Sequence, residues 1–461
     1  MENFWGSDVW GSLSLMAVLL LALLVANMIK RSIPFMKKSL IPTSVLGGIL
    51  LLLFAEVYQW ITGDWVFNTP FFNGNGANML EIITYHALAL GFIASSFKAG
   101  GGKFGKKRSV EIFNSGVTTV STYLIQAILG LGITMVAAVV ISGFFPAAGV
   151  LLPFGYGQGT GQAMNYGMIY EKLGFVGGKS FGLTVAAFGF LSASIGGVIH
   201  LNILRRKKKI DMEKIREGSI VMQQVQGEDE VPMEGSMDKL TIQVALVGGA
   251  YMLAYGLMSL LAYLLPNMSN TIFGFNFLLG VVAATAVKTV LNFCNKKKII
   301  KRKYVNDFLM TRISNICFDV MVISGIAAIR LSLLEQYWGV ILILGVVGMV
   351  VTYFYNLFVA KKLFPDYEDE QFLVMYGMLT GTASTGIILL REIDGQFKTP
   401  AADNLVYQQF PAIVFGFPMM LLANMAPGKE WLTLGILVAF FIVMNLILFR
   451  SFIFKRKKKK D

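Results

Sequence analysis

The 461-residue sequence is poor in the side chains that form covalent cross-links and zinc sites. It contains two cysteines, Cys294 and Cys317, and two histidines, His86 and His200. Cys317 lies inside an apolar run, so a disulfide framework is excluded, and the usual cluster of His and Cys zinc ligands cannot be assembled. We therefore expect neither a disulfide framework nor a zinc site.

Charged residues are also scarce. Asp, Glu, Lys and Arg make up 15% of the chain, whereas hydrophobic residues make up 55% and the mean hydropathy is +0.64. Soluble domains carry about 25% charged residues, so this composition indicates an integral membrane protein surrounded by lipid. The net charge of +13 does not indicate a nucleic-acid partner, because the Lys and Arg residues lie in short runs between apolar segments.

Long apolar runs alternate with these short basic runs. A run of about 17 to 25 apolar residues is long enough to cross a bilayer as a helix. Five such runs precede a polar segment, five follow it, and one more lies near the C-terminus. The predicted spans are residues 11–28, 40–61, 79–97, 117–142, 181–204, 240–265, 271–292, 308–334, 340–360, 406–425 and 431–449. The sequence therefore predicts an all-α polytopic membrane protein.

The basic residues fall on one side of this arrangement. Basic clusters follow the first, third, fifth, seventh and ninth spans and close the chain, whereas the opposite side holds only Lys172, Lys179 and Lys429. Loops rich in Lys and Arg remain in the cytoplasm. We expect the N-terminus to lie outside and the C-terminus to lie in the cytoplasm.

Two glycine-rich polar stretches, at residues 155–165 and 377–386, interrupt the apolar pattern. Irregular backbone within a bilayer is tolerated only where it lines protein or a water-filled cavity. The one-sided placement of basic residues requires the first stretch to enter from outside and return there, and the second to enter from the cytoplasm and return there. We predict two re-entrant hairpins, at about residues 147–170 and 371–391.

The two stretches occupy matching places in the two halves of the chain. Gly159-Thr160 matches Gly381-Thr382 at an offset of 222 residues. An odd number of spans in each half gives the halves opposite orientations, as in the inverted repeats of many secondary transporters. We predict two repeats of five spans each, at residues 1–204 and 239–426, a cytoplasmic linker at 205–238, and an extra span with a basic tail at 427–461.

The two stretches also carry the candidate substrate-binding residues. Glycine lets two backbones and a ligand approach closely, and exposed N–H, C=O, hydroxyl and amide groups replace water around a carboxylate or a sodium ion. Close helix packing by small residues is the alternative interpretation. We expect the substrate to contact Gln158, Gly159, Thr160, Gly161, Gln162, Gly381, Thr382, Ala383, Ser384 and Thr385.

Ionisable residues form a second group of candidates. Asp319 and Arg330 lie within the predicted span 308–334, eleven residues apart, which is too far for direct pairing within one helix. Arg391 is a candidate for binding a substrate carboxylate with two parallel hydrogen bonds, and a loop salt bridge is its alternative role. For sodium we expect Asn165, Asn315, Asp319 and Thr380 as ligands, with a structural ion pair as the alternative for Asp319.

An acidic run at residues 366–370 precedes the second stretch. Such a run would bind magnesium in a membrane enzyme that acts on a lipid-linked substrate. No second acidic motif within a span accompanies it, so we favour a solvated loop beside Lys361 and Lys362.

Several motifs together resemble the bacterial sodium/glutamate symporter family. They include Gly47-Gly48, Lys98-Ala99-Gly100-Gly101, Gly157-Gln158-Gly159-Thr160-Gly161 with the segment 170–175 after it, Phe188-Gly189 and Gly196-Gly197. The resemblance covers about residues 30–425. It implies a sodium-coupled symporter of L-glutamate or a closely related dicarboxylate in the bacterial inner membrane. Such a protein is not an enzyme, and it has sodium as its coupling ion and no cofactor. It also implies a homodimer of two inverted five-helix repeats, each with a re-entrant loop, and an elevator-like movement of a transport domain.

The chain also departs from the pattern of this family. The family commonly has His at the position of Gln158, its second glycine-rich stretch has more glycine and a proline near Ser384, and the last span is extra. We expect substrate specificity to depend on Gln158. The alternatives are an exchanger or proton-coupled carrier of another organic anion, the membrane enzyme described above, and a structural or receptor role.

Overall fold

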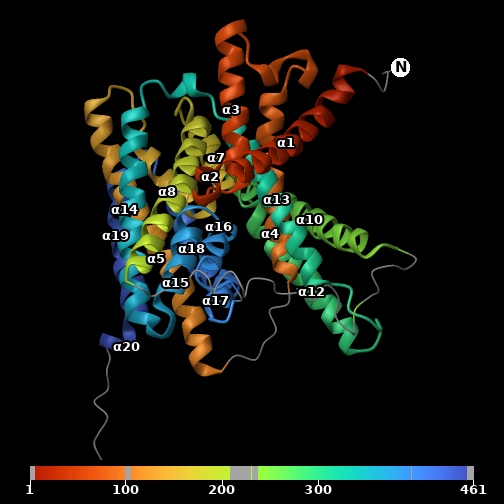
Figure 1. Cartoon of the computed structure of the whole chain (residues 1–461), viewed down its shortest axis with the longest axis vertical. Coiled ribbons are helices and arrows are strands. Elements are labelled where there is room, and N and C mark those ends of the chain that lie inside the picture. Colours follow the sequence, from red (N-terminus) through yellow and green to blue (C-terminus); the bar gives the residue numbers. More distant parts are fainter. Residues whose placement is uncertain (1–5, 99–104, 208–229, 231–236, 396, 454–461) are drawn as a thin grey trace, which may run out of the picture.

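The computed structural model describes residues 6–98, 105–207, 230, 237–395 and 397–453 (Figure 1). Within these residues the chain is almost entirely helical, and the one extended pairing is an isolated bridge between Glu230 and Lys303. Ten described helices are long and apolar enough to cross a membrane, and an eleventh span is counted if the bent pair α17 and α18 forms one. The predicted all-α polytopic architecture is confirmed.

The long helices follow most of the predicted spans. They are α1 (Ser7–Ser32), α3 (Thr43–Thr62), α4 (Gly76–Phe97), α5 (Lys106–Val140), α8 (Gly178–Arg206), α10 (Lys239–Leu264), α12 (Asn276–Lys296), α13 (Asp307–Ala327), α14 (Trp338–Leu363), α18 (Gln409–Met425) and α19 (Glu430–Leu448). Short helices join them: α2 (Pro34–Lys38), η1 (Val66–Asn68), η2 (Pro70–Phe72), η3 (Pro146–Val150), η4 (Pro266–Met268), α11 (Ser269–Gly274), η5 (Leu331–Leu334), η6 (Pro365–Tyr367), α17 (Ala401–Tyr407) and α20 (Arg450–Ile453).

The two largest differences between helix boundaries and predicted apolar runs are at the start of α5 and the end of α13. Helix α5 begins at Lys106, well before the predicted residue 117, because its first three turns carry polar side chains that pack against other parts of the protein. Helix α13 ends at Ala327, and Arg330 has an extended backbone before η5. The prediction that Arg330 lies inside a span is therefore wrong. Hydropathy alone could not show this end, because the apolar sequence continues through η5.

Each glycine-rich stretch folds into a pair of short helices that pack against each other. The first pair is α6 (Leu151–Gln158) and α7 (Thr160–Glu171), and the second is α15 (Glu368–Thr380) and α16 (Ala383–Arg391). The rings of Phe154 and Tyr166 stack at 4.0 Å across the first pair. Gly377 and Gly386 let the backbones of α15 and α16 approach closely, since a methyl group added at Gly377 would lie 2.7 Å from the Cα atom of Gly386.

The helices form two bundles that lie side by side in Figure 1. The hairpin bundle contains both helix pairs together with α5, α8, α14, α17, α18 and α19, and the flanking bundle contains α1, α3, α4, α10, α12 and α13. Helix α7 contacts α4 and α13, so the first hairpin lies at the boundary of the two bundles. This arrangement places both glycine-rich stretches where a pocket between bundles can form.

Several helices carry basic residues at one end, which we call the basic ends. They include Lys30 and Arg31 on α1, Arg205 and Arg206 on α8, and Lys361 and Lys362 on α14. Most of the predicted linker, the basic residue Lys103, the Gly100-Gly101 motif and the basic tail at 455–460 lie outside the described residues. The division into two inverted repeats and the re-entrant path of the hairpins stay predictions.

Candidate functional site

The two glycine-rich stretches meet in space. Gly159 joins α6 to α7 with φ +79° and ψ −169°, a backbone conformation that only glycine adopts without strain. A methyl group added at Gly159 would lie 3.4 Å from Cγ2 of Thr382 and 3.4 Å from Cε of Met321. We call residues 157–161 the first tip and residues 380–385 the second tip. Their contact means that one ligand can touch both.

A pocket lies between the two tips and holds about 870 Å³ of empty space, its open mouth included. Both tips contribute to its lining, and the other walls come from α4, α5, α12, α13, α15 and α18. Its lining includes Gly157, Gln158, Thr382, Ala383, Phe92, Ser95, Thr119, Tyr123, Phe318, Met321, Met378, Gln408, Gln409, Gly416 and Met420.

Gln158 is the polar side chain of the first tip that lines the pocket. It is half-buried at the end of α6, and its Oε1 atom is buried without a hydrogen-bond partner. A buried carbonyl oxygen without a partner is costly, so this atom is ready to accept a hydrogen bond or to bind a cation.

Thr160 and Gly161 face the flanking bundle and are not among the residues that line the pocket. The hydroxyl of Thr160 donates to the carbonyl oxygen of Met321 at 3.0 Å. A methyl group added at Gly161 would lie 2.9 Å from Cβ of Leu88 on α4. These two residues hold the first tip against α13 and α4, as the helix-packing interpretation expects.

Gln162 and Asn165 lie further along α7 and are fully buried. The Asn165 amide donates to the carbonyl oxygen of Gly274 at 2.6 Å and to Oε1 of Gln162 at 3.1 Å. Oδ1 of Asn165 and Nε2 of Gln162 are buried without partners. Asn165 therefore offers an oxygen to a cation, although neither residue is among those that line the pocket.

The second tip is held mainly by its own hydrogen bonds. Thr380 is buried, and its hydroxyl donates to the carbonyl oxygen of Tyr376 at 2.6 Å. The hydroxyl oxygens of Thr382 and Thr385 are 3.4 Å apart. Ser384, which precedes Thr385 in the sequence, is half-buried. Thr382 and Ala383 line the pocket, so the start of α16 is the part of this tip that a ligand meets.

The charged candidates lie outside the pocket lining. Arg391 is exposed at the far end of α16, with its guanidinium 5.4 Å from the centre of the Phe397 ring. Asn315 and Asp319 lie on an exposed face of α13. The guanidinium of Arg330 lies over the Trp65 ring at 5.2 Å.

Helix α5 holds both tips through residues that sequence reasoning missed. The hydroxyl of Tyr123 donates to the carbonyl oxygen of Gly157 at 3.1 Å. The amide of Gln126 donates to the carbonyl oxygen of Leu379 at 3.0 Å and to the hydroxyl of Thr352 at 2.7 Å. Because α5 bonds to the last turn of α6 and the last turn of α15, it fixes the position of one tip relative to the other.

The sequence did contain a signal for these residues. Helix α14 carries Thr352-Tyr353 and Asn356 where α5 carries Thr122-Tyr123 and Gln126, at a constant offset of 230 residues. The two motifs meet antiparallel, because Gln126 donates to Thr352 and Asn356 donates to Thr122 at 3.4 Å. Neither motif contains a charged residue or a glycine, so the sequence features that predicted the other candidate residues do not mark these two motifs.

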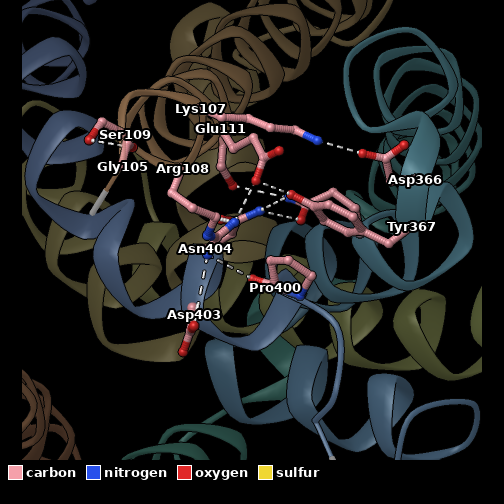
Figure 2. A network of polar contacts seen from close by, with 12 residues as sticks. Gly105, Lys107, Arg108, Ser109, Glu111, Asp366, Tyr367, Pro400, Asp403 and Asn404 are labelled. Carbon is pink, nitrogen blue, oxygen red and sulfur yellow. Dashed lines mark hydrogen bonds and ion pairs between the residues drawn. The ribbon is translucent and has the colours of Figure 1, made fainter. Parts of the chain in front are cut away.

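A polar network joins the start of α5 to η6 and α17 (Figure 2). Arg108 donates to Glu111 at 2.6 Å and to Asn404 at 3.0 Å, and the Tyr367 hydroxyl donates to Glu111 at 2.9 Å. Burial raises the pKa of Tyr367, so its phenol stays protonated and remains a donor. The chain of bonds continues from Asn404 through Gln371 and Ser115 to the pocket residue Gln408.

The acidic run before the second tip is used in ion pairing. Asp366 lies 2.7 Å from Nζ of Lys107 (Figure 2), and both side chains are exposed. No group of three or more His, Cys, Asp or Glu side chains that could hold a metal occurs in the described part of the chain.

A second ion-pair group lies at the helix ends opposite the basic ends. Nζ of Lys179, in the first turn of α8, lies 2.7 Å from Glu81 on α4 and 3.5 Å from Glu171 on α7. Lys172 donates to Asn270 at 2.9 Å. The contact between Lys179 and Glu81 joins the hairpin bundle to the flanking bundle on that side. The contact between Lys172 and Asn270 joins the end of α7 to α11.

Comparison with known proteins agrees with this architecture. The family profile described as sodium/glutamate symporter matches residues 10–398. Curated sodium/glutamate symporters of Escherichia coli (strain K12) and Shigella flexneri are each 28% identical to the chain over 183 residues. The aligned segment covers 39% of this chain and 41% of each relative, so the match spans less than half of their length. Because the family profile covers most of the sequence, the chain belongs to the sodium/glutamate symporter family, which is a family of transporters and not of enzymes.

Proposed function

We propose that this chain is a sodium-coupled symporter of L-glutamate or a closely related dicarboxylate that works by alternating access. The observation that carries the proposal is the contact between Gly159 and Thr382 at the pocket. Broken helices that meet at one site, with helix ends directed at the solute, are the binding arrangement of many secondary transporters. The printed description of the relatives supplies the substrate.

The pocket offers suitable groups for a carboxylate. Helix α16 begins at Ala383, which lines the pocket, so the first turn of this helix lies at the pocket, and helix N-termini favour anions. The hydroxyl of Thr382 and the Gln158 side chain are within the same lining. These neutral donors position the substrate oxygens.

The charge of the pocket gives a physical reason for coupling to a cation. None of the described residues that line it is Lys, Arg or His. A dicarboxylate entering this lining therefore gains from a sodium ion bound nearby, because opposite charges attract strongly where water is excluded. Of the four predicted ligands, Asn165 is the best supported, because its Oδ1 atom is buried without a partner. Thr380 is buried at the second tip, whereas Asn315 and Asp319 lie on an exposed face of α13.

We propose that the pocket opens toward the basic ends of the helices. Its lining extends both ways: Ser95 near the end of α4 and Gln409 at the start of α18 lie toward these ends, whereas Phe277 at the start of α12 and Met420 near the end of α18 lie toward the opposite ends. On the other side, Lys179 and Glu81 join the two bundles. We assign the basic ends to the cytoplasm of a bacterial inner membrane, with the N-terminus outside and the C-terminus inside, so the structure is inward-facing.

The movement that exposes the pocket to the other side is an elevator-like displacement of the hairpin bundle against the flanking bundle. The antiparallel contact of the matched motifs on α5 and α14 supports two inverted repeats within this chain. A homodimer, with the flanking bundle as its stationary part, is part of the same proposal.

Uptake of labelled glutamate into proteoliposomes tests the proposal. An inward sodium gradient at fixed pH is expected to drive accumulation, and replacement of external sodium by choline is expected to abolish it. Uptake that persists in choline and follows a proton gradient would establish the proton-coupled alternative. Glutamate counterflow without an ion gradient, together with no gradient-driven accumulation, would establish an exchanger.

A further inference from the structure

Gln408 lies at the bend between α17 and α18 and lines the pocket between the tips, although its side chain is fully buried. Its Oε1 atom accepts hydrogen bonds from the hydroxyls of Ser115 at 2.5 Å and Thr119 at 3.3 Å, both on α5. Its Nε2 atom donates to Sδ of Met378, another pocket residue, at 3.0 Å. A thioether is a weak acceptor, so this NH2 group would form a stronger bond with a carboxylate oxygen in the pocket.

The orientation of this amide is set by the polar network behind it. In a buried amide the oxygen can only accept and the NH2 group can only donate, so its neighbours decide which way it faces. The network begins at Arg108, whose guanidinium can only donate (Figure 2). The atom of Asn404 that lies 3.0 Å from Nη1 of Arg108 is therefore the oxygen, Oδ1. The NH2 group of Asn404 faces the other way.

The direction of the bonds then passes from Asn404 to Ser115. Nδ2 of Asn404 donates to the Tyr367 hydroxyl and to Oε1 of Gln371, both at 2.9 Å. Since the oxygen of Gln371 faces Asn404, its NH2 group faces Ser115 and donates to the hydroxyl oxygen at 3.1 Å. Asn404, Gln371 and Ser115 are all buried, so an amide turned the wrong way would leave buried polar atoms without partners.

The Ser115 hydroxyl carries this direction to Gln408. Its oxygen accepts from Gln371, which leaves its hydrogen for an acceptor. Oε1 of Gln408 at 2.5 Å is a closer and stronger acceptor than Sδ of Met375 at 3.4 Å. The carbonyl group of Gln408 therefore faces α5, and its NH2 group faces the pocket. Arg108 thus determines, through four hydrogen bonds, that the pocket presents a donor at this position.

We propose that the NH2 group of Gln408 donates to one carboxylate of the substrate, and that Arg108 sets this orientation through the network. The proposal rests on the function proposed above and adds a specificity: the pocket distinguishes a carboxylate from a carboxamide at one end of the solute. A carboxamide has an NH2 group in place of one carboxylate oxygen, so a donor of the pocket loses its acceptor. Gln408 contacts the substrate, whereas Asn404, Gln371 and Ser115 position the Gln408 side chain.

Binding to the purified full-length protein tests the contact at Gln408. Dissociation constants of L-glutamate, L-glutamine and L-isoglutamine are measured by isothermal titration calorimetry in sodium buffer, since each of the two amides replaces one carboxylate. We expect glutamate to bind at least tenfold more tightly than one of these amides, because a hydrogen bond to a charged group is lost. Gln408→Glu, which turns an oxygen toward the pocket, is expected to lower this preference at least tenfold. Gln408→Met, which has neither the donor nor the added oxygen, is expected to lower it less.

Asn404→Asp tests the network from outside the pocket. Aspartate accepts on both sides, so Gln371 turns its NH2 group toward residue 404 and its oxygen toward Ser115. Ser115 then donates to Gln371, and Gln408 turns its NH2 group toward Ser115 and its oxygen toward the pocket. We expect the preference for glutamate over the amide to fall at least tenfold. Asp403→Asn, which alters the adjacent and exposed carboxylate, is the matched control and should leave the preference unchanged.

Ser115→Ala separates the effect of orientation from the effect of charge. In this background the network is interrupted, so Asn404→Asp is expected to have no further effect on the preference. An effect of the added charge alone would persist there and would overturn the proposal. An unchanged preference in both Gln408→Glu and Asn404→Asp, with normal thermal unfolding, would also overturn it. Because binding is measured without an ion gradient, loss of sodium-driven uptake with the glutamate preference intact would contradict the proposed symport and leave this inference standing.

Discussion

The Tyr123 hydroxyl donates a hydrogen bond to the carbonyl oxygen of Gly157 at 3.1 Å, which attaches α5 to the first tip. One turn later on the same helix, Gln126 donates to the carbonyl oxygen of Leu379 at 3.0 Å and attaches α5 to the second tip. Because both tips are hydrogen-bonded to α5, the side chains of this helix fix the distance between the tips. A substrate that touches both tips depends on this separation.

Tyr123→Phe removes the bond to the first tip without changing the size of the ring. A hydrogen bond of this kind contributes about 1 kcal/mol, so we expect about a fivefold rise in the glutamate concentration that gives half-maximal uptake. Tyr255→Phe, which changes an exposed tyrosine on α10, is the control and should leave uptake unchanged. An unaltered half-maximal concentration in Tyr123→Phe would show that α5 does not position the tip.

Gly159→Ala strains the first tip. A residue other than glycine at this φ and ψ costs about 1–3 kcal/mol, and the added methyl group would also touch Thr382. We expect glutamate uptake to fall at least fivefold while the protein still inserts and purifies. Gly435→Ala on α19, where the added methyl group meets open space, should have no effect on uptake. Equal uptake by both variants would contradict the role of the tip.

Gln158→Glu places a negative charge in the pocket with almost no change in shape. Repulsion between this charge and a dicarboxylate is expected to raise the half-maximal glutamate concentration at least tenfold, which corresponds to about 1.4 kcal/mol. Gln158→Met, which is similar in volume but neutral, should have a clearly smaller effect. If the two variants behave alike, the substrate does not approach Gln158.

Lys179→Met breaks the contact between the bundles on the side opposite the basic ends. Loss of an ion pair worth about 1 kcal/mol shifts the population of outward-facing protein about fivefold. A cysteine at Gln409, in a chain with Cys294 and Cys317 replaced by serine, reports this shift. We expect slower labelling by an impermeant maleimide added to inside-out vesicles.

The control for this experiment is Lys429→Met, which removes an exposed lysine. It should label at the original rate. Faster labelling in Lys179→Met would show that the ion pair holds the opposite state, and the assignment of the structure as inward-facing would be wrong.

The fold was largely predictable because a bilayer imposes strong rules on sequence. Apolar runs of sufficient length gave most of the spans, and the glycines around Gly159 and Gly381 located the two helix breaks. Helix ends that depend on packing were not predictable. The start of α5 at Lys106 is polar, and the end of α13 at Ala327 is followed by further apolar residues.

The site was predictable only in part. Gly159, Gln158, Thr382 and Ala383 were found from composition and do lie together at the pocket or at the contact between the tips. In the structure the Thr160 hydroxyl bonds to Met321 and does not line the pocket, because the position of a residue within a helical turn decides which neighbour its side chain contacts. Thr119, Tyr123 and Gln408 were missed because uncharged polar residues inside a span look the same whether they bind a ligand or another helix.

Binding stoichiometry tests the central claim most directly, namely that the two tips form one substrate site. Isothermal titration calorimetry of glutamate into the purified protein in sodium buffer is expected to show one site per chain. The same titration of Gln158→Glu in the first tip and of Thr382→Val in the second should show binding weakened by each change. Two independent sites, or full affinity after either change, would contradict the account.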